Sequence, residues 1–153
     1  MNYVKYITLG LFAIFALQCS AQKETKTVKK ELTNTTKNSK IKIVELEEIT
    51  RGSKRNASIS ETSKMIVLPG KIKNTPTTKT NWIDVESTIN AISLEEINSY
   101  PAPTTDRFHD GALAATIKIT TSTGKVYTSQ TFDAGSPPKE LAKLYILLSE
   151  NFK

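Results

Sequence analysis

The sequence has one cysteine and one histidine among its 153 residues, and it has no glycine-rich phosphate-binding loop. Because Cys19 is the only cysteine, no disulfide can form within the chain, and we expect the fold to depend on its core alone. The G-x-x-x-x-G-K-[ST], G-x-G-x-x-G and C-x-x-C patterns do not occur. We therefore expect no cofactor.

The single histidine, His109, is the main candidate for catalysis, but no G-x-S-x-G nucleophile elbow accompanies it. Sequence spacing leaves a Ser/His/Asp grouping open. Asp106, His109, Asp110 and Asp133 could together offer oxygen and nitrogen ligands to a divalent ion. One histidine with scattered aspartates is a small supply of ligands, and Asp110-Gly111 is typical of a turn. We expect no metal site and no enzymatic activity, with an enzyme using His109 as a lesser hypothesis.

The longest apolar run, Ile7 to Leu17, has eleven residues, which is shorter than the roughly 20 that a membrane-spanning helix needs. Lys5 precedes it and the small or polar residues 18–22 follow it. This is the layout of a secretory signal peptide, so we expect residues 1–21 to be one. The mature chain would then be exported, either to the periplasm or to the medium.

Two kinds of processing fit this signal. Cys19-Ser20-Ala21 before Gln22 matches the small-x-small site of ordinary signal peptidase. Residues 16–19, Ala-Leu-Gln-Cys, resemble a lipoprotein box, in which Cys19 would be lipidated, although Gln18 stands where a small residue is usual. Both alternatives place the protein outside the cytoplasm, and a lipid on Cys19 would be its only attachment to a cell-envelope membrane.

The formal net charge of +6 is unevenly distributed along the chain. Residues 23–40 carry six lysines against two glutamates, whereas residues 41–153 hold fourteen Lys or Arg against thirteen Asp or Glu. The predicted domain is thus nearly neutral, which argues against nucleic-acid binding. Residues 22–40, rich in Lys, Thr and Asn, are expected to form a disordered spacer. A basic arm that contacts anionic headgroups or acidic glycans is the alternative.

Residues 41–153 are expected to form a single α+β domain in the order βββαββα. Apolar residues alternate from Leu113 to Ile119, Gly124 permits a return, and Val126 to Phe132 is a second β-rich run. Trp82, Val85, Ile89 and Ile92 share one helical face. We predict a mainly antiparallel sheet of about five strands with two helices on one face.

Several local patterns set the expected ends of these elements. Lys71 to Lys79, rich in Thr and Pro, is expected to be an irregular loop. Asn81 is the expected N-cap of the first helix, with Asp84 in its first turn, and Ser93 with Glu96 resembles a capping box. Ser136 is expected to cap the last helix, with Pro137 and Pro138 as its first residues.

Two motifs carry a resemblance to known proteins. T-x-x-R-x-x-D-G-A at Thr104–Ala112 and F-D-x-G-x-P-P at Phe132–Pro138, with T-R-G-S around Arg51, resemble small exported proteins of Bacteroidota bacteria, which implies export but no particular function. The order of elements also resembles emfourin-type inhibitors of thermolysin-like metalloproteases. That resemblance implies protease inhibition as an alternative function.

The hypothesis favoured by the sequence is an exported, non-enzymatic binding or envelope-accessory domain, monomeric, with an unknown protein or envelope partner. Its expected contact sites are the polar turn at residues 51–56 and the loop at residues 104–110, because exposed loops commonly carry function. The candidate binding residues are Arg51, Lys54, Arg55, Arg107, His109 and Asp110.

Overall fold

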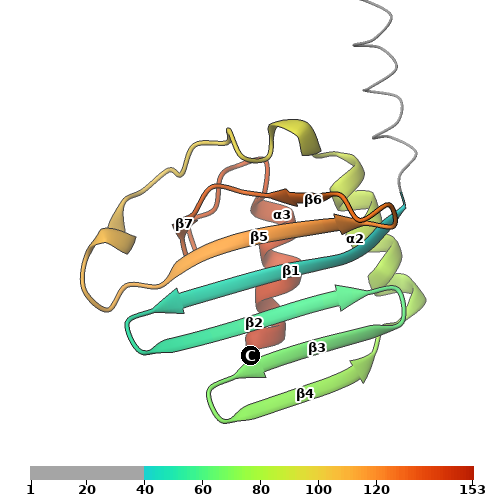
Figure 1. The fold of residues 1–153 in the computed structure, drawn as a ribbon, viewed down its shortest axis with the longest axis horizontal. Coiled ribbons are helices and arrows are strands. Elements are labelled where there is room, and N and C mark those ends of the chain that lie inside the picture. The colour runs from blue at the N-terminus through green and yellow to red at the C-terminus, as the bar shows by residue number, and fades with distance from the viewer. Residues whose placement is uncertain (1–39) are drawn as a thin grey trace, which may run out of the picture. The chain divides into compact units, whose positions relative to one another are not determined.

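The computed structural model describes residues 40–153; the predicted signal peptide, Cys19 and nearly all of the predicted spacer lie outside the described residues. A seven-stranded antiparallel sheet forms the front layer in Figure 1. Its strands are β1 (Ile41–Thr50), β2 (Ser53–Ser60), β3 (Ser63–Leu68), β4 (Lys71–Pro76), β5 (Ala114–Thr121), β6 (Val126–Thr128) and β7 (Phe132–Asp133). The order across the sheet is β4-β3-β2-β1-β5-β6, and β7 pairs with β5.

Two helices, α2 (Lys79–Asn90) and α3 (Ala142–Ser149), lie behind the sheet on the same face (Figure 1). Short 3-10 turns are η1 (Leu94–Glu96), η2 (Asp106–Phe108) and η3 (Glu150–Phe152). The α+β class, the antiparallel sheet and the one-sided helices are therefore confirmed. Among the described residues, no helix has the length and apolar character required to cross a membrane.

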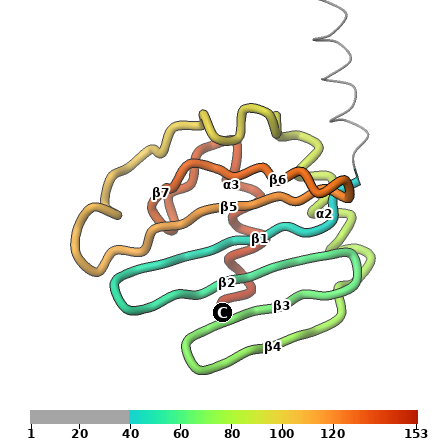
Figure 2. Tube along the Cα trace, viewed as in Figure 1, coloured from blue at the N-terminus to red at the C-terminus, as the bar shows by residue number. Residues whose placement is uncertain are grey.

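The core lies between the sheet and the two helices. The central strands β1 and β5 pair along most of their length, and Figure 2 shows them side by side although about 60 residues of chain separate them. Their alternate residues point toward the helices and are buried, as the period-two pattern predicts. The buried side chains include Val44, Leu46, Ile117 and Ile119 from the strands and Trp82, Val85, Ile89, Leu144 and Leu148 from the helices.

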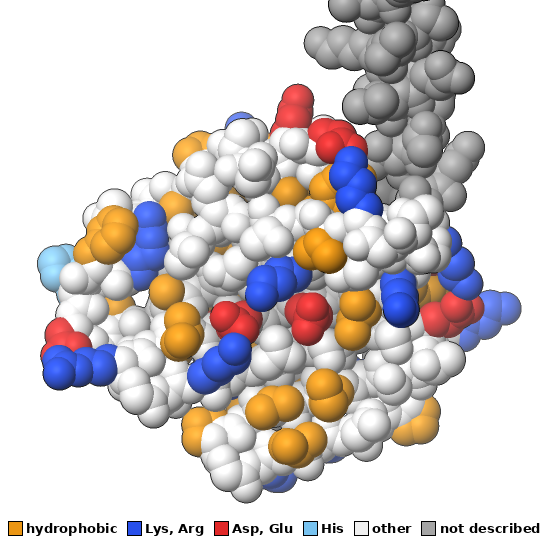
Figure 3. All heavy atoms as spheres, in the orientation of Figure 1, with side chains coloured by type: hydrophobic (Ala, Val, Ile, Leu, Met, Phe, Trp, Pro, Cys, Tyr) orange, Lys and Arg blue, Asp and Glu red, His pale blue; other side chains and the backbone are white. Residues whose placement is uncertain are grey.

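The other side of the sheet, which we call the open face, is exposed to solvent and faces the viewer in Figure 3. Charged side chains occupy its centre, where Lys54 is paired with Glu47 at 2.5 Å. At the β3–β4 edge of the open face, the strand register places Met65 beside Asn74 and Val67 beside Ile72. Met65 and Ile72 are 41% and 71% exposed, so β3 and β4 carry an apolar patch there.

The expectation of an irregular loop at residues 71–79 was wrong, because β4 and the start of α2 occupy it. Pro69-Gly70 forms a two-residue turn in which Gly70 has a φ of 73°, and β4 then pairs with β3 from Lys71 to Pro76. As an edge strand, β4 buries almost nothing, and Ile72 between two lysines is its only large apolar residue, so its sequence lacks the repeated apolar alternation by which strands are recognised. The strand count therefore exceeds the expected five.

The second strand of the predicted hairpin is divided into β6 and β7 by Ser129. The hydroxyl oxygen of Ser129 accepts a hydrogen bond from the Ile117 backbone N–H at 3.0 Å, while the Ser129 N–H donates to the Ile117 carbonyl at 2.9 Å. One side chain thus takes the place of a backbone acceptor in the ladder. The strand deviates there and resumes at Phe132, whose ring is completely buried.

The expected helix starts also need correction. Thr78 caps α2, since its hydroxyl accepts the Asn81 N–H at 3.2 Å, and Asp84 lies beyond the first turn. Ser93 makes no side-chain capping bond to η1, so the predicted capping box does not form. Ser136 donates its N–H to Asp133 in a bridge, and α3 begins only at Ala142, after Pro137 and Pro138.

Candidate functional site

The two segments predicted to carry binding residues meet at one end of the sheet. Arg51, in the β1–β2 turn, lies 3.7 Å from the Asp110 carboxylate, and their side chains are 86% and 79% exposed. Arg51, Arg107, His109 and Asp110 line the same shallow depression of about 550 Å³. Four of the six candidate residues are therefore brought together.

Lys54 and Arg55 do not join this group, since they lie on opposite faces of β2. Lys54 is on the open face with Glu47. Arg55 points toward the helices, where its Nε lies 2.5 Å from the Glu48 carboxylate and its guanidinium lies 4.6 Å from the Phe152 ring centroid. The Glu48 side chain is fully buried, so Arg55 neutralises a charge inside the protein.

Tyr145 of α3 completes this buried network. Its hydroxyl donates to the second Glu48 oxygen at 2.7 Å and accepts the Gly135 backbone N–H at 2.7 Å. Burial, followed by the hydrogen bond to Glu48 and its negative charge, raises the pKa of Tyr145 to about 12. The phenol therefore stays protonated as a donor, and it fixes α3 to the first strand.

Arg107 is held by Asp133 in a second network. The Asp133 carboxylate accepts hydrogen bonds from the Thr104 hydroxyl and from the backbone N–H groups of Asp106, at 2.9 Å, and Arg107, at 2.6 Å. The Arg107 guanidinium lies 3.4 Å from the same carboxylate and donates to the Thr104 carbonyl at 2.5 Å. Asp133 thus shapes the 104–108 loop and links the two sequence motifs, and the side chain of Arg107 is only 15% exposed.

This network predicts a pH dependence of stability. Burial alone would raise the pKa of Asp133, but the hydrogen bonds from Thr104, Arg107 and Asp106 outweigh it and hold the pKa below the ordinary value of 3.8. The charged form therefore stabilises the fold above pH 3.8. As the pH falls further, the unfolded chain takes up the proton first, and the stabilisation disappears once the pH passes below the folded-state pKa.

We expect Asp133→Asn to be less stable than the unchanged protein at neutral pH and to lose less stability on acidification. The measurement is the free energy of unfolding in urea at several pH values between 7 and about 3. Asp110→Asn is the matched control, because its carboxylate is exposed and it should follow the unchanged protein. An Asp133→Asn protein with the full acid-dependent loss would contradict the assignment.

Two of the four residues considered as possible metal ligands, Asp110 and Asp133, have other side-chain partners. Asp133 is turned toward the loop that it stabilises, and Asp110 pairs with Arg51 on the exposed rim. His109 contributes its backbone N–H to the Asp106 carbonyl at 2.8 Å. Within residues 40–153, no group of three or more His, Cys, Asp or Glu side chains could hold a metal ion.

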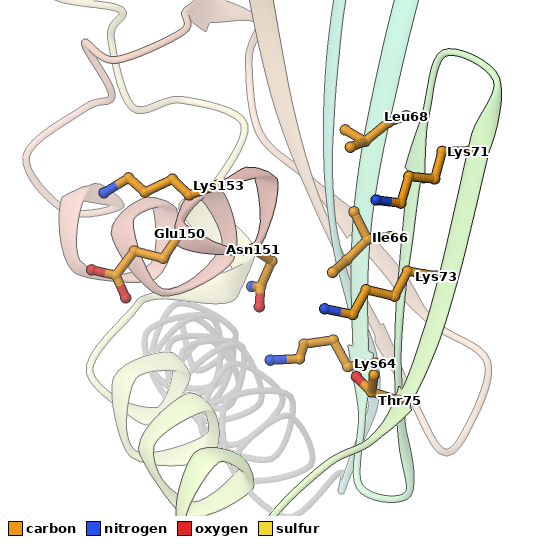
Figure 4. A pocket seen from close by; sticks show the side chains of 9 residues that line it. All are labelled: Lys64, Ile66, Leu68, Lys71, Lys73, Thr75, Glu150, Asn151 and Lys153. Atoms are coloured by element: carbon orange, nitrogen blue, oxygen red, sulfur yellow. The ribbon is translucent and has the colours of Figure 1, made fainter.

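A second concave site lies between the chain end and strands β3 and β4, and the sequence analysis did not anticipate it. We call it the lysine groove; it has a volume of about 270 Å³. It is lined by Lys64, Ile66 and Leu68 of β3, Lys71, Lys73 and Thr75 of β4, and Glu150, Asn151 and Lys153 at the chain end. Figure 4 shows the ammonium groups of Lys64, Lys71 and Lys73 directed from the sheet toward η3.

These three lysines converge on one groove and have no acidic partner there, whereas the other unpaired lysines of residues 40–153, apart from Lys153 of the same lining, lie outside it. Ion pairs within residues 40–153 involve Lys40, Lys54, Lys125, Lys139, Arg51, Arg55 and Arg107, but none of the lysines of the groove. The one acidic side chain of the lining, Glu150, points away from them in Figure 4. The groove is therefore a positively charged concavity in a domain that is nearly neutral overall.

A signal for this site was present in the sequence. Lys71 and Lys73 flank Ile72, which is the alternation of a strand with one charged and one apolar side. It was missed because two lysines in a Thr- and Pro-containing segment are typical of a loop. Lys64 reaches the same face only through the register that places it beside Thr75.

Comparison of this chain with protein-family models, with curated proteins and with solved structures found no match, so the functional argument depends on its own geometry.

Proposed function

We propose that residues 40–153 form the binding domain of an exported, non-enzymatic protein, and that the lysine groove takes the anionic groups of its ligand. The observation that carries this proposal is the set of three convergent lysines without acidic partners. Like charges held close together repel one another, and an anion in the groove would relieve that repulsion. The apolar floor at Ile66 and Leu68 would reduce the competition from water.

The proposal predicts that a short acidic probe binds at the groove. We would titrate the full chain with fluorescein-labelled hexaglutamate and follow the anisotropy. Lys71→Glu/Lys73→Glu should weaken binding at least about tenfold, because each charge-assisted contact contributes about 1.5–3 kcal/mol.

The matched control is Lys42→Glu/Lys143→Glu, which makes the same change in net charge at exposed lysines of β1 and α3. This control should bind the probe within about twofold of the unchanged protein, given that distant exposed charges are screened at physiological salt. Equal losses in the two double variants would show that binding follows net charge, including that of the basic residues 23–40. That result would overturn the proposal.

Inhibition of a thermolysin-like metalloprotease is the second proposal, in line with the resemblance described above. The observation that favours it is the pairing of the exposed β1–β2 turn with the 104–110 loop through Arg51 and Asp110. Two adjacent exposed loops could together occupy a protease cleft. The two proposals are separated by an assay of a thermolysin-like protease with this protein in micromolar excess. If the protease keeps its full activity, the inhibitor proposal is rejected.

A further inference from the structure

The strand that carries two of the groove lysines is also a free edge of the sheet. Strand β4 is last in the order β4-β3-β2-β1-β5-β6, and no other strand within residues 40–153 pairs with its outer side. In an antiparallel ladder, alternate residues direct their backbone N–H and C=O groups away from the existing neighbour. These groups can pair with an extended peptide.

The two faces of β4 differ in chemistry. Lys71 and Lys73 lie on the groove face, with Lys64 of the neighbouring strand on the same side. Ile72 lies on the open face beside Val67 and close to Met65, and its side chain is 71% exposed. Figure 3 shows hydrophobic side chains gathered at the β3–β4 end of the open face. A peptide lying along β4 would thus meet positive charge on one side and apolar surface on the other.

We propose that β4 binds an extended peptide by strand addition and that the peptide alternates acidic with apolar residues. This inference rests on the proposed function, and it adds the class of ligand and the mode of binding. Residues at i and i+2 of a strand are about 6.8 Å apart on one face, so Lys71 and Lys73 match acidic residues at alternate peptide positions. The apolar residues between them would extend the patch formed by Met65, Val67 and Ile72.

Charge argues for this partner over the two other candidates. A second copy of the chain pairing through β4 would place Lys71 and Lys73 near the same lysines of its partner. Residues 23–40 of this chain carry six lysines against two glutamates, so they too would be repelled. An acidic strand meets neither repulsion, and pairing of opposite charges across strands is favourable.

The experiment compares three peptides of the same length against the full chain by fluorescence anisotropy. The first alternates Glu and Val over six residues, and the second has the same composition with the three Glu residues adjacent. The third is the alternating peptide with all of its backbone nitrogens methylated, which keeps the side chains and removes the N–H donors. We expect the first to bind at least tenfold more tightly than the other two.

Hydrogen exchange locates the peptide. Binding of the alternating peptide should slow the exchange of outward-facing β4 amides and leave those of the opposite edge strand, β6, unchanged. Ile72→Ala should weaken the alternating peptide several-fold, whereas Ile83→Ala, at an isoleucine of α2 that is 52% exposed, should not. Both are single exposed side chains, so the comparison separates contact at the edge from a general loss of apolar surface.

Four other results of these measurements would overturn the inference, and each points to a different cause. Equal affinity for the alternating and the block peptide, with hexaglutamate binding still dependent on Lys71 and Lys73, would retain the anion site and reject strand addition. Tight binding of the methylated peptide would likewise reject backbone pairing. If no acidic peptide binds, both proposals fail, and the lysines serve to keep the edge from pairing with other chains. Protection of β4 that rises with protein concentration alone would identify a second copy as the partner.

Discussion

Replacing Arg55 with alanine is expected to lower the free energy of unfolding by about 3 kcal/mol, since it leaves a buried carboxylate without its cation. Glu48 is completely buried, with Arg55 at 2.5 Å on one oxygen and Tyr145 at 2.7 Å on the other. The value lies toward the lower end of the range for broken buried pairs, because Arg55 is itself 35% exposed and Tyr145 still donates. Urea denaturation at neutral pH measures it.

Lys54→Ala is the matched control for this change. Lys54 precedes Arg55 in β2 but pairs with Glu47 on the open face, where its side chain is 56% exposed. Exposed pairs of this kind contribute about 0–1 kcal/mol. If Arg55→Ala and Lys54→Ala lowered the free energy of unfolding by the same small amount, Arg55 would have no structural role. The prediction that Arg55 binds a ligand would then be favoured again. If Arg55→Ala is unstable yet binds hexaglutamate normally when folded, Arg55 acts in the core.

The largest expected loss is for Phe132→Ala, at about 4 kcal/mol. The Phe132 ring is fully buried between β5 and α3, and it meets the Tyr145 ring edge-to-face with 5.7 Å between centroids. Alanine would leave a cavity and remove the aromatic pair. A domain of this size typically has about 5–15 kcal/mol of stability in total, so the variant should approach unfolding at 37 °C.

Phe132→Leu is the control for the cavity, since leucine refills much of the volume and should recover about half of the loss. The check is the midpoint of thermal unfolding followed by near-UV circular dichroism, which also reports on the packing of Tyr145. A Phe132→Ala protein with an unchanged midpoint would mean that the 132–133 segment is not part of the cooperative core.

The elements that could be predicted from the sequence are those that bury one face. The strand pattern is visible from Leu113 to Ile119 because every second residue enters the core. The helix pattern is visible from Trp82 to Ile92 because every third or fourth residue does. Strand β4 buries no face, so it had no such pattern. The helix starts failed for another reason. Asn81, Ser93 and Ser136 all have capping chemistry, but tertiary contacts decide which polar residue caps, and Ser136 is instead engaged with Asp133.

The candidate site residues were likewise predictable only in part. Proximity of the 51–56 turn to the 104–110 loop follows from the pairing of β1 with β5, which no local pattern contains. Arg55 and Arg107 were predicted to be binding residues because nothing in the sequence identifies Glu48 and Asp133 as their acidic partners. Only the fold shows that these acids are buried. The groove lysines were overlooked since the strand that carries two of them had not been identified.

The bond between Tyr145 and Glu48 joins positions 97 residues apart, and β1 obtains its second neighbour only when β5 has been made. During synthesis, the β1–β4 meander leaves the ribosome with one side of β1 unpaired and with Glu48 lacking one of its two partners. Contacts of such high sequence separation slow folding, because a long loop must close before they form. The synthesis of β5 and α3 therefore sets the time at which β1 becomes committed to its native place.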